Sequence, residues 1–338
     1  MAATFTAKHD PALEARVTES HEMVYADGPS EDDDRPPHVL AASGLSAFRE
    51  HLAVVQDDAN WVALIDAEQK ITAVPLPPGP DGKRVFTKSR GNADNKYDFE
   101  ACITVPGEHG LELIGFASCS EPERVWILRI CETGARDDEG GPKFHSEFIN
   151  AKRFYEMLRQ ETAFSGAGLN IEGAVTLDDE RIVLFQRGNA EPRGGLQPVD
   201  AMAELSWTEL RRFLSDPDNA PVPPIKNIRT YDLGDVDGIR LTFSDAEHLG
   251  GGRILYSASA EDPDSDKIAG SVLGILEPDG TACWTQLIDQ DGSDFTGKIE
   301  GLTRDTTDEN KIYFVIDDDD DQVPSKIYHA VINDRFLR

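Results

Sequence analysis

Short apolar runs recur along the chain, and polar turns rich in Gly and Asp separate them. Five runs open with an acidic residue or a serine followed by a small residue, then continue through a strand, a tight turn and a second apolar strand. Because consistent offsets indicate a repeat architecture, the pattern predicts five copies of one unit. The opening pairs are Ser43-Gly44, Glu100-Ala101, Glu172-Gly173, Asp245-Ala246 and Glu300-Gly301, and the second strands are Leu52–Gln56, Leu111–Ala117, Ile182–Gln186, Ile254–Ser257 and Ile312–Ile316.

Further apolar runs extend each unit. Third strands are expected at Trp61–Ile65, Val125–Ile130, Ala201–Leu205, Gly270–Leu276 and Lys326–Ile332, and fourth strands at Lys70–Leu76, near Phe154–Leu158, at Ile228–Leu233 and at Cys283–Leu287. The fifth unit has no fourth strand of its own. A strand-like segment at Ala15–Tyr25 can supply that strand and close the ring, which removes exposed sheet edges.

The sequence therefore predicts an all-β, five-bladed β-propeller that forms a single domain over residues 1–338, with blades starting near residues 43, 100, 172, 245 and 300. A six-bladed ring stays open, because the units from Glu100 and Glu172 carry long insertions. One or two insertions are helical. Ser206–Ser215 has a capping box, and Asn150–Gln160 has apolar residues at helical spacing, which competes with a fourth strand there.

Composition narrows the classes of partner. The formal net charge is −30, so binding to nucleic acid or to an anionic membrane is not expected. No apolar run is long enough to span a membrane, and the first residues lack the apolar core of a secretory signal. The four cysteines lack metal-ligand spacing and are interpreted as reduced, so a cytoplasmic location is expected. The expected partner is a small anionic ligand or another protein.

The first residue of each unit is the strongest candidate for chemistry. In a propeller these residues converge near one mouth of the central channel, and carboxylates at close range need a cation to stay ionised. Ca²⁺ suits an irregular set of oxygen ligands, so a calcium site is predicted. Alternatively, each acid accepts backbone hydrogen bonds from a neighbouring blade and fixes its register. The predicted metal ligands are Ser43, Glu100, Glu172, Asp245 and Glu300.

A second set of polar residues follows the second strands and is expected to frame the same mouth. Basic residues there suit an anionic substrate, and a carboxylate can act as general base. Each basic residue can instead simply pair with a ring carboxylate. The predicted catalytic residues are Asp57, Arg124, Arg187 and Asp317, and the predicted substrate-binding residues are Lys96, Ser118, Ser120, Asn189, Asp58 and Asp318. The Asp317–Asp321 run lacks the spacing of an EF-hand loop.

These motifs resemble a family of uncharacterised bacterial proteins predicted to be propellers, from about residue 40 onward. The resemblance implies no activity, and Ala117 replaces a glycine typical of those relatives. The matching segments are Lys96–Ala101, Ala117–Ser120 with Arg124, Asn170–Gly173, Gln186–Asn189 and Lys298–Gly301.

More distantly, the chain resembles calcium-activated nucleotidases (apyrases), which are five-bladed with a central Ca²⁺. The resemblance rests on Ser43, Glu100, Glu172 and Glu300, with Ser244 or Asp245 as the remaining ligand, and on Leu45-Ser46 and Asp57-Asp58. The Glu-Gly motif is also similar to phytase-like and gluconolactonase-like propellers, which use calcium or another divalent metal to hydrolyse phosphoesters or lactones.

Two hypotheses of different classes follow. The first is a Ca²⁺-dependent hydrolase of a small anionic substrate such as a phosphoester, in which Arg187 and Arg124 stabilise negative charge and Asp57 or Asp317 is the base. The second is a non-catalytic propeller that binds a small molecule or a protein and uses any central cation structurally. An open metal position beside a basic residue favours the first hypothesis. A set of carboxylate–arginine pairs favours the second.

Overall fold

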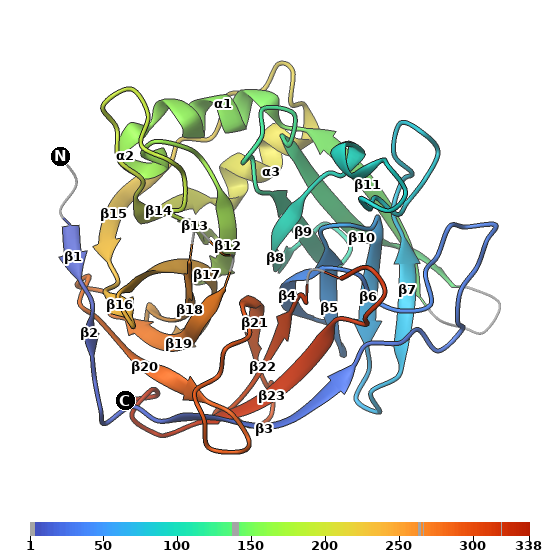
Figure 1. The fold of residues 1–338 in the computed structure, drawn as a ribbon. Helices are drawn as coiled ribbons and strands as arrows, with labels where there is room; N and C mark the ends of the chain where they lie inside the picture. The colour runs from blue at the N-terminus through green and yellow to red at the C-terminus, as the bar shows by residue number, and fades with distance from the viewer. Residues whose placement is uncertain (1–3, 137–141, 263–264, 266, 319) are drawn as a thin grey trace.

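The computed structural model describes residues 4–136, 142–262, 265, 267–318 and 320–338, which fold mainly as β-strands with few helices. Four-stranded antiparallel units are arranged around a centre (Figure 1). The first is β4 (Ala42–Phe48), β5 (His51–Gln56), β6 (Trp61–Ile65) and β7 (Ile71–Pro75). The second is β8 (Phe99–Pro106), β9 (Leu111–Ala117), β10 (Trp126–Arg136) and β11 (Pro142–Asn150).

The later units follow the same order, from an inner strand outward. They are β12 (Ile171–Thr176), β13 (Arg181–Gln186), β14 (Asp200–Ser206) and β15 (Lys226–Asp232), followed by β17 (Ile239–Gly250), β18 (Arg253–Glu261), β19 (Ile268–Leu276) and β20 (Ala282–Ile288), with the short β16 (Asp235–Val236) beside β17. The C-terminal strands are β21 (Ile299–Arg304), β22 (Lys311–Ile316) and β23 (Lys326–Ile332). These strands and the β17–β20 unit belong to one continuous hydrogen-bonded sheet.

The N-terminal segment runs along the outside of three units (Figure 1). Two short strands, β1 (Thr4–Thr6) and β2 (Lys8–His9), pair in parallel with β15 and β20. The following strand, β3 (Ala15–Glu22), pairs antiparallel with β23 and also touches β20 in parallel, at Leu287 opposite Ala15. The segment expected to complete the last unit therefore lies beside that unit's outermost strand.

The innermost strands β4, β8, β12, β17 and β21 each contact the next, and β21 contacts β4. The small residue of each opening pair explains how closely they approach. A Cβ added to Gly301 would lie 2.3 Å from the carbonyl oxygen of Ser43, and one added to Gly44 would lie 2.8 Å from the backbone nitrogen of Cys102. Backbone packs directly on backbone at the centre, so larger side chains do not fit there.

The hydrophobic core lies in layers between neighbouring units. One layer joins Leu45 and Val54 of the first unit to Val315 and Ile327 of the last. Another joins Phe185 of β13 to β17 and β18, where aromatic rings pack edge to face. Each sheet thus buries both of its faces against its neighbours, which accounts for the nearly continuous apolar runs of the second strands.

Three helices lie among the described residues: α1 (Lys152–Gln160), α2 (Thr162–Ser165) and α3 (Trp207–Ser215), with a 3₁₀ turn at Ala93–Asn95. The expected fourth strand near Phe154–Leu158 is wrong, since α1 occupies that stretch and β11 is the fourth strand instead. Apolar residues at helical spacing are the signal that prevailed. The cap of α3 is as predicted, with Ser206 Oγ accepting from Glu209 N at 3.1 Å. No described helix is long and apolar enough to cross a membrane.

Candidate metal and anion site at one end of the inner strands

A β-bulge interrupts the pairing of each inner strand with the second strand of its unit. The pairing of β8 with β9, β12 with β13, and β21 with β22 shifts by one residue at Glu100, Glu172 and Glu300. A bulge redirects the side chain of the extra residue, and here it brings the three carboxylates within 4.8 Å of one another. The polar residue two positions earlier, just before each strand begins, contributes to the same cluster in all three cases.

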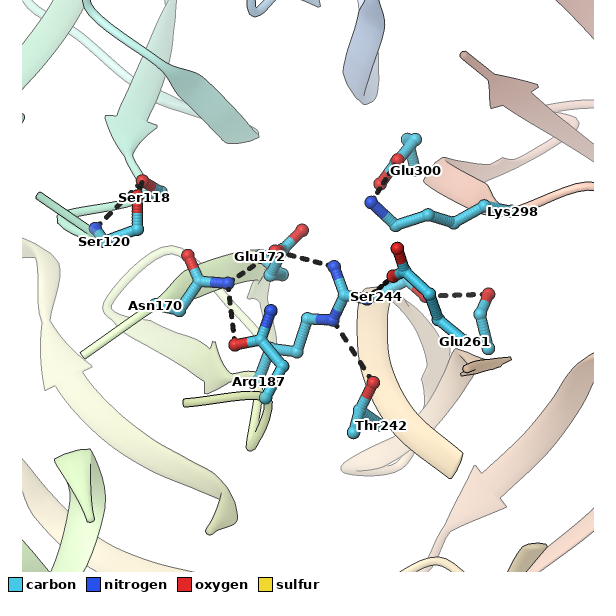
Figure 2. Close-up of polar contacts among 12 residues, drawn as sticks. Ser118, Ser120, Asn170, Glu172, Arg187, Thr242, Ser244, Glu261, Lys298 and Glu300 are labelled. Atoms are coloured by element: carbon cyan, nitrogen blue, oxygen red, sulfur yellow. Dashed lines mark hydrogen bonds and ion pairs between the residues drawn. The ribbon is translucent and has the colours of Figure 1, made fainter. Parts of the chain in front are cut away.

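Glu172 is held by two buried partners from its own unit, one of which also reaches the next unit. Asn170 Nδ2 donates to Glu172 Oε1 at 2.7 Å, and Arg187 Nη1 lies 3.1 Å from the same oxygen. Arg187 also pairs with Glu261 at the end of β18, and its Nε donates to Thr242 at 3.2 Å. Figure 2 shows the guanidinium between the two carboxylates. Because Arg187 is only 4% exposed, it is a structural link between units rather than an open anion site.

Glu300 has one partnered oxygen and one free oxygen. Lys298 Nζ lies 2.6 Å from Glu300 Oε1 (Figure 2), while the buried Oε2 has no hydrogen-bond partner among the residues that the structure describes. Burial raises the pKa of Glu300 to about 7, although the charge of Lys298 opposes the shift. The pKa of this carboxyl group therefore lies near neutral pH rather than in the usual acidic range of a glutamate.

A second acidic group adjoins the first on the side of the first two units. Lys96 Nζ contacts Asp57, Asp58 and Asp98, and Arg124 Nη1 lies 2.9 Å from Asp98 Oδ2. Burial, and then the charge of Asp98, raises the pKa of Asp57 well above its usual range. Burial alone would raise the pKa of Asp98, but a hydrogen bond with Asp57 and the charges of Lys96 and Arg124 lower it. The pKa of Asp57 is thus raised while that of its neighbour Asp98 is lowered.

Glu100 links the two groups. Its carboxylate is within 4.8 Å of the ligand atoms of Asp57 and Asp98 on one side, and of Glu172 and Glu300 on the other. Unlike these four, Glu100 has no hydrogen bond or ion pair among the described residues. Burial raises the pKa of Glu100 well above its usual range, and the surrounding carboxylates raise it further. A cation placed beside Glu100 would relieve that repulsion.

A cavity of about 810 Å³ opens beside this cluster. Among the predicted residues, Asp57, Asp58, Lys96, Arg124 and Asp317 line it. Ser118 and Ser120 are connected to this lining by hydrogen bonds. Both hydroxyl groups donate to Asp98, and Ser120 Oγ accepts from Arg124 Nη1 at 2.8 Å. The second-strand ends thus meet the inner-strand acids at one mouth.

Other predicted residues do not line this cavity. Asn189 is exposed and accepts from Asn170 at 3.2 Å, and Asp318 pairs with Lys326 at 3.3 Å. Ser43 donates to the carbonyl of Ala41 at 3.2 Å rather than joining the carboxylates. Asp319, within the Asp317–Asp321 run, lies outside the described residues.

Asp245 does not join the carboxylate cluster. Its Oδ2 accepts from the backbone nitrogen of Leu302 in β21 at 2.7 Å, and its Cα lies 2.9 Å from a Cβ added to Gly173. Burial raises the pKa of Asp245 well above its usual range, against the effect of backbone donors. At this position the alternative interpretation holds, in which the acid fixes the register of a neighbouring inner strand.

The sequence reasoning missed Asp98, Asn170, Lys298 and Glu261 as site residues. For the first three the sequence did hold a regularity, because each is a polar residue two positions before a bulge glutamate. All three precede their strands, and Asp98 has a positive φ of 64°, so strand alternation alone does not place them in the site. Glu261 carries no such signal. It reaches Arg187 only because β18 ends beside β13, which the sequence pattern does not specify.

The fold and the site define an all-β protein. At one end of its innermost strands lies a buried cluster of carboxylates, several of which pair with lysine or arginine side chains. The chain belongs to a family of unknown function, DUF6929, whose model matches residues 38–332. No curated protein matches the chain.

Solved structures give only loose similarity. A gluconolactonase from Xanthomonas campestris is 11% identical over 96% of this chain and 99% of its own, with a TM-score of 0.38. Virginiamycin B lyase from Staphylococcus aureus is 11% identical over 95% and 99%, with a TM-score of 0.37. A GH43 β-1,3-galactosidase is 7% identical over 92% of this chain and 58% of its own, with a TM-score of 0.49. With TM-scores below 0.5, these likenesses assign no function.

Proposed function

We propose that this chain is a single-domain, five-bladed β-propeller closed by β3, and that it is a Ca²⁺-dependent hydrolase of a small anionic substrate such as a phosphoester. The blade count rests on the closed circuit of contacts among β4, β8, β12, β17 and β21. The observation that carries the function is Glu100, an acid without hydrogen-bond or ion-pair partners among the described residues, placed between two groups of carboxylates. All four cysteines are unpaired, in keeping with a cytoplasmic location.

The residues present fit a hard divalent cation. Glu100, Glu172 and Glu300 would hold it, and the buried, unpartnered Oε2 of Glu300 provides an oxygen with no other role. This group contains only carboxylates, which are ligands typical of Ca²⁺ rather than of Zn²⁺. When bound, the cation would polarise a substrate oxygen and neutralise negative charge.

The chain's own residues would supply positioning and proton transfer. Lys96 and Arg124 line the cavity and would orient an anionic group. Asp57 also lines the cavity and, with its raised pKa, holds a proton that it can transfer to or from substrate. We give Arg187 a positioning part, because Glu172 and Glu261 already occupy its guanidinium. Asp317 stays a candidate base on the rim.

A second candidate is a non-catalytic propeller that binds a small anion or a protein at this mouth. The observation in its favour is that Lys96, Arg124, Arg187 and Lys298 are all paired with carboxylates. Such pairing is what a structural polar network requires, whether or not a reaction occurs.

Calorimetric titration of chelator-treated protein with Ca²⁺ and with Mg²⁺ tests the metal site. Wild type should bind one Ca²⁺, and Glu100→Gln and Glu172→Gln should weaken binding at least tenfold. Glu108→Gln, at an exposed glutamate of the β8–β9 turn, should change nothing. No Ca²⁺ binding by the wild type would overturn the proposal.

A screen of phosphoesters and lactones, with Ca²⁺ and with chelator, separates the two candidates. Turnover that needs Ca²⁺ and is lost in Asp57→Asn supports the hydrolase. Ca²⁺ binding without turnover of any compound supports the non-catalytic propeller.

A further inference from the structure

A cluster outside the inner-strand site joins β3 to β23. Glu19 and His21 are two residues apart in β3 and so lie on one face of the strand, and His329 of β23 is directly opposite Glu19 in the register. A bulge follows His329 in this pairing, and Thr18 Oγ1 donates to the carbonyl of His329 at 3.1 Å. The local backbone therefore holds the three side chains together.

The three side chains offer ligand atoms within 4.8 Å of one another. Nδ1 of His329 lies 2.7 Å from Glu19 Oε1, and His21 Nε2 lies 3.6 Å from Glu19 Oε2. The two imidazole rings meet edge to face, with centroids 5.3 Å apart. This arrangement links an outer strand contributed by the N-terminal segment to the C-terminal strand of the same unit.

His329 provides the independent sign of a ligand. It is 3% exposed, yet neither ring nitrogen makes a hydrogen bond in the part of the chain described, and Nδ1 is the nitrogen that lies beside Glu19 in the cluster. Buried imidazole nitrogens are normally hydrogen-bonded or metal-bound. The ring of Tyr313 packs against His329 at 4.8 Å and closes one side of the cluster, while Glu19 and His21 stay open to solvent on the other.

We propose that Glu19, His21 and His329 bind a transition-metal ion of the Zn²⁺ class across the seam between β3 and β23. Two imidazoles and one carboxylate are ligands typical of Zn²⁺, in contrast to the all-carboxylate group at the inner strands. Ligand atoms around a tetrahedral Zn²⁺ lie roughly 3.3–3.6 Å apart. The exposed Glu19 and His21 can reach that spacing by small side-chain rotations, and solvent completes the coordination.

Such a site would fasten the N-terminal segment to the sheet that it completes. A metal that binds only the folded state stabilises that state, and this one bridges two strands that are 311 residues apart between Thr18 and His329. The inference is independent of the proposed hydrolase activity, because none of its ligands lines the cavity beside Glu100.

Titration of tag-free, chelator-treated protein with Co²⁺, followed by visible absorption, tests the site, with Zn²⁺ as competitor. Wild type should bind one Co²⁺ with the intense bands of low coordination number, and Zn²⁺ should displace it. Affinity should fall at least tenfold in His21→Ala and in Glu19→Gln, both exposed positions at which folding should persist. His109→Ala, at an exposed turn, and Glu100→Gln, at the inner-strand site, should match wild type.

Hydrogen exchange provides a second readout that is local to the seam. Saturating Zn²⁺ should slow exchange of the β3 amides in wild type but not in His21→Ala. No Co²⁺ or Zn²⁺ binding by wild type would overturn the proposal. So would binding that His21→Ala leaves within twofold of wild type, or binding that Glu100→Gln abolishes, since the metal would then lie elsewhere.

Discussion

Replacing Arg187 by Met tests whether that side chain holds the units together or serves a substrate. Arg187 is buried between Glu172 and Glu261, which come from two different units. Met keeps most of the side chain's volume and apolar stem but removes the charge. The substitution therefore leaves two carboxylates facing each other without their common partner.

The expected loss of stability is large. Removing one member of a buried ion pair costs about 3–5 kcal/mol, because the remaining charge stays buried and unpaired. On the same strand, Arg181 pairs with Asp178, and their side chains are 50% and 47% exposed. An exposed pair contributes only about 0.2–1 kcal/mol, so Arg181→Met is a matched control that should unfold almost as wild type does.

Urea denaturation measures the free energy of unfolding of both variants. Titration with Ca²⁺ provides a second, independent measurement. Without Arg187, Glu172 loses a neighbouring positive charge, so Ca²⁺ affinity should rise although the metal-free protein is less stable. A loss below about 1 kcal/mol for Arg187→Met would refute the structural role. Unchanged stability together with weaker substrate binding would return Arg187 to the catalytic set.

Three further predictions concern single positions. Asp245→Ala should lower the free energy of unfolding by about 1–3 kcal/mol, because the buried amide of Leu302 loses its acceptor, and calorimetry should show Ca²⁺ affinity unchanged; a large loss of affinity would return Asp245 to the metal ligands. The pKa of Glu300 is raised from 4.5 to about 7 in the folded protein. Between these pH values the folded state binds more protons than the unfolded state, so the stability of the metal-free protein should fall as pH rises from about 4.5 to 7. Thermal melts from pH 5 to 8 should show this fall in wild type and a smaller one in Glu300→Gln; equal slopes would contradict it. Gly301→Ala would place a Cβ 2.3 Å from the carbonyl oxygen of Ser43. Urea denaturation should therefore show a free energy of unfolding lower by about 1–3 kcal/mol, as is typical of overpacking, and an unchanged free energy of unfolding would refute the close approach.

The strand pattern was predictable because it depends on local chemistry repeated along the chain. Apolar runs and Asp- and Gly-rich turns predicted strands where most inner and second strands lie, although β17 begins at Ile239, before its acid-plus-small pair Asp245-Ala246. The short strands β1 and β2 have three and two residues, too few to show such a pattern. They are held by pairing with distant strands and by side-chain contacts such as the stacking of Phe5 on Tyr231. The stretch of α1 was ambiguous, because its aromatic residues suit a buried helix as well as a strand.

The candidate site was predictable in part for a similar reason. The repeat aligns Asp245 with Glu100, Glu172 and Glu300, but it does not tell which side chain turns to a neighbouring backbone and which to the cavity. That choice depends on side-chain length and on the nearest unpaired amide. Ion pairs between units, such as the one between Arg187 and Glu261, depend on three-dimensional proximity and leave no periodic trace.

The pairing of β3 with β23 also fixes an order of events during synthesis. Thr18 and the residue that accepts its hydrogen bond are 311 residues apart. At translation rates of about 5–20 residues per second, β3 therefore waits roughly 15–60 s for its partner to be made. Of its residues only Ala15 and Val17 are buried in the finished fold, so the waiting strand exposes little apolar surface to other nascent chains. The seam is thus the last part of the sheet that can form, and its mostly polar sequence suits a strand that must wait in water.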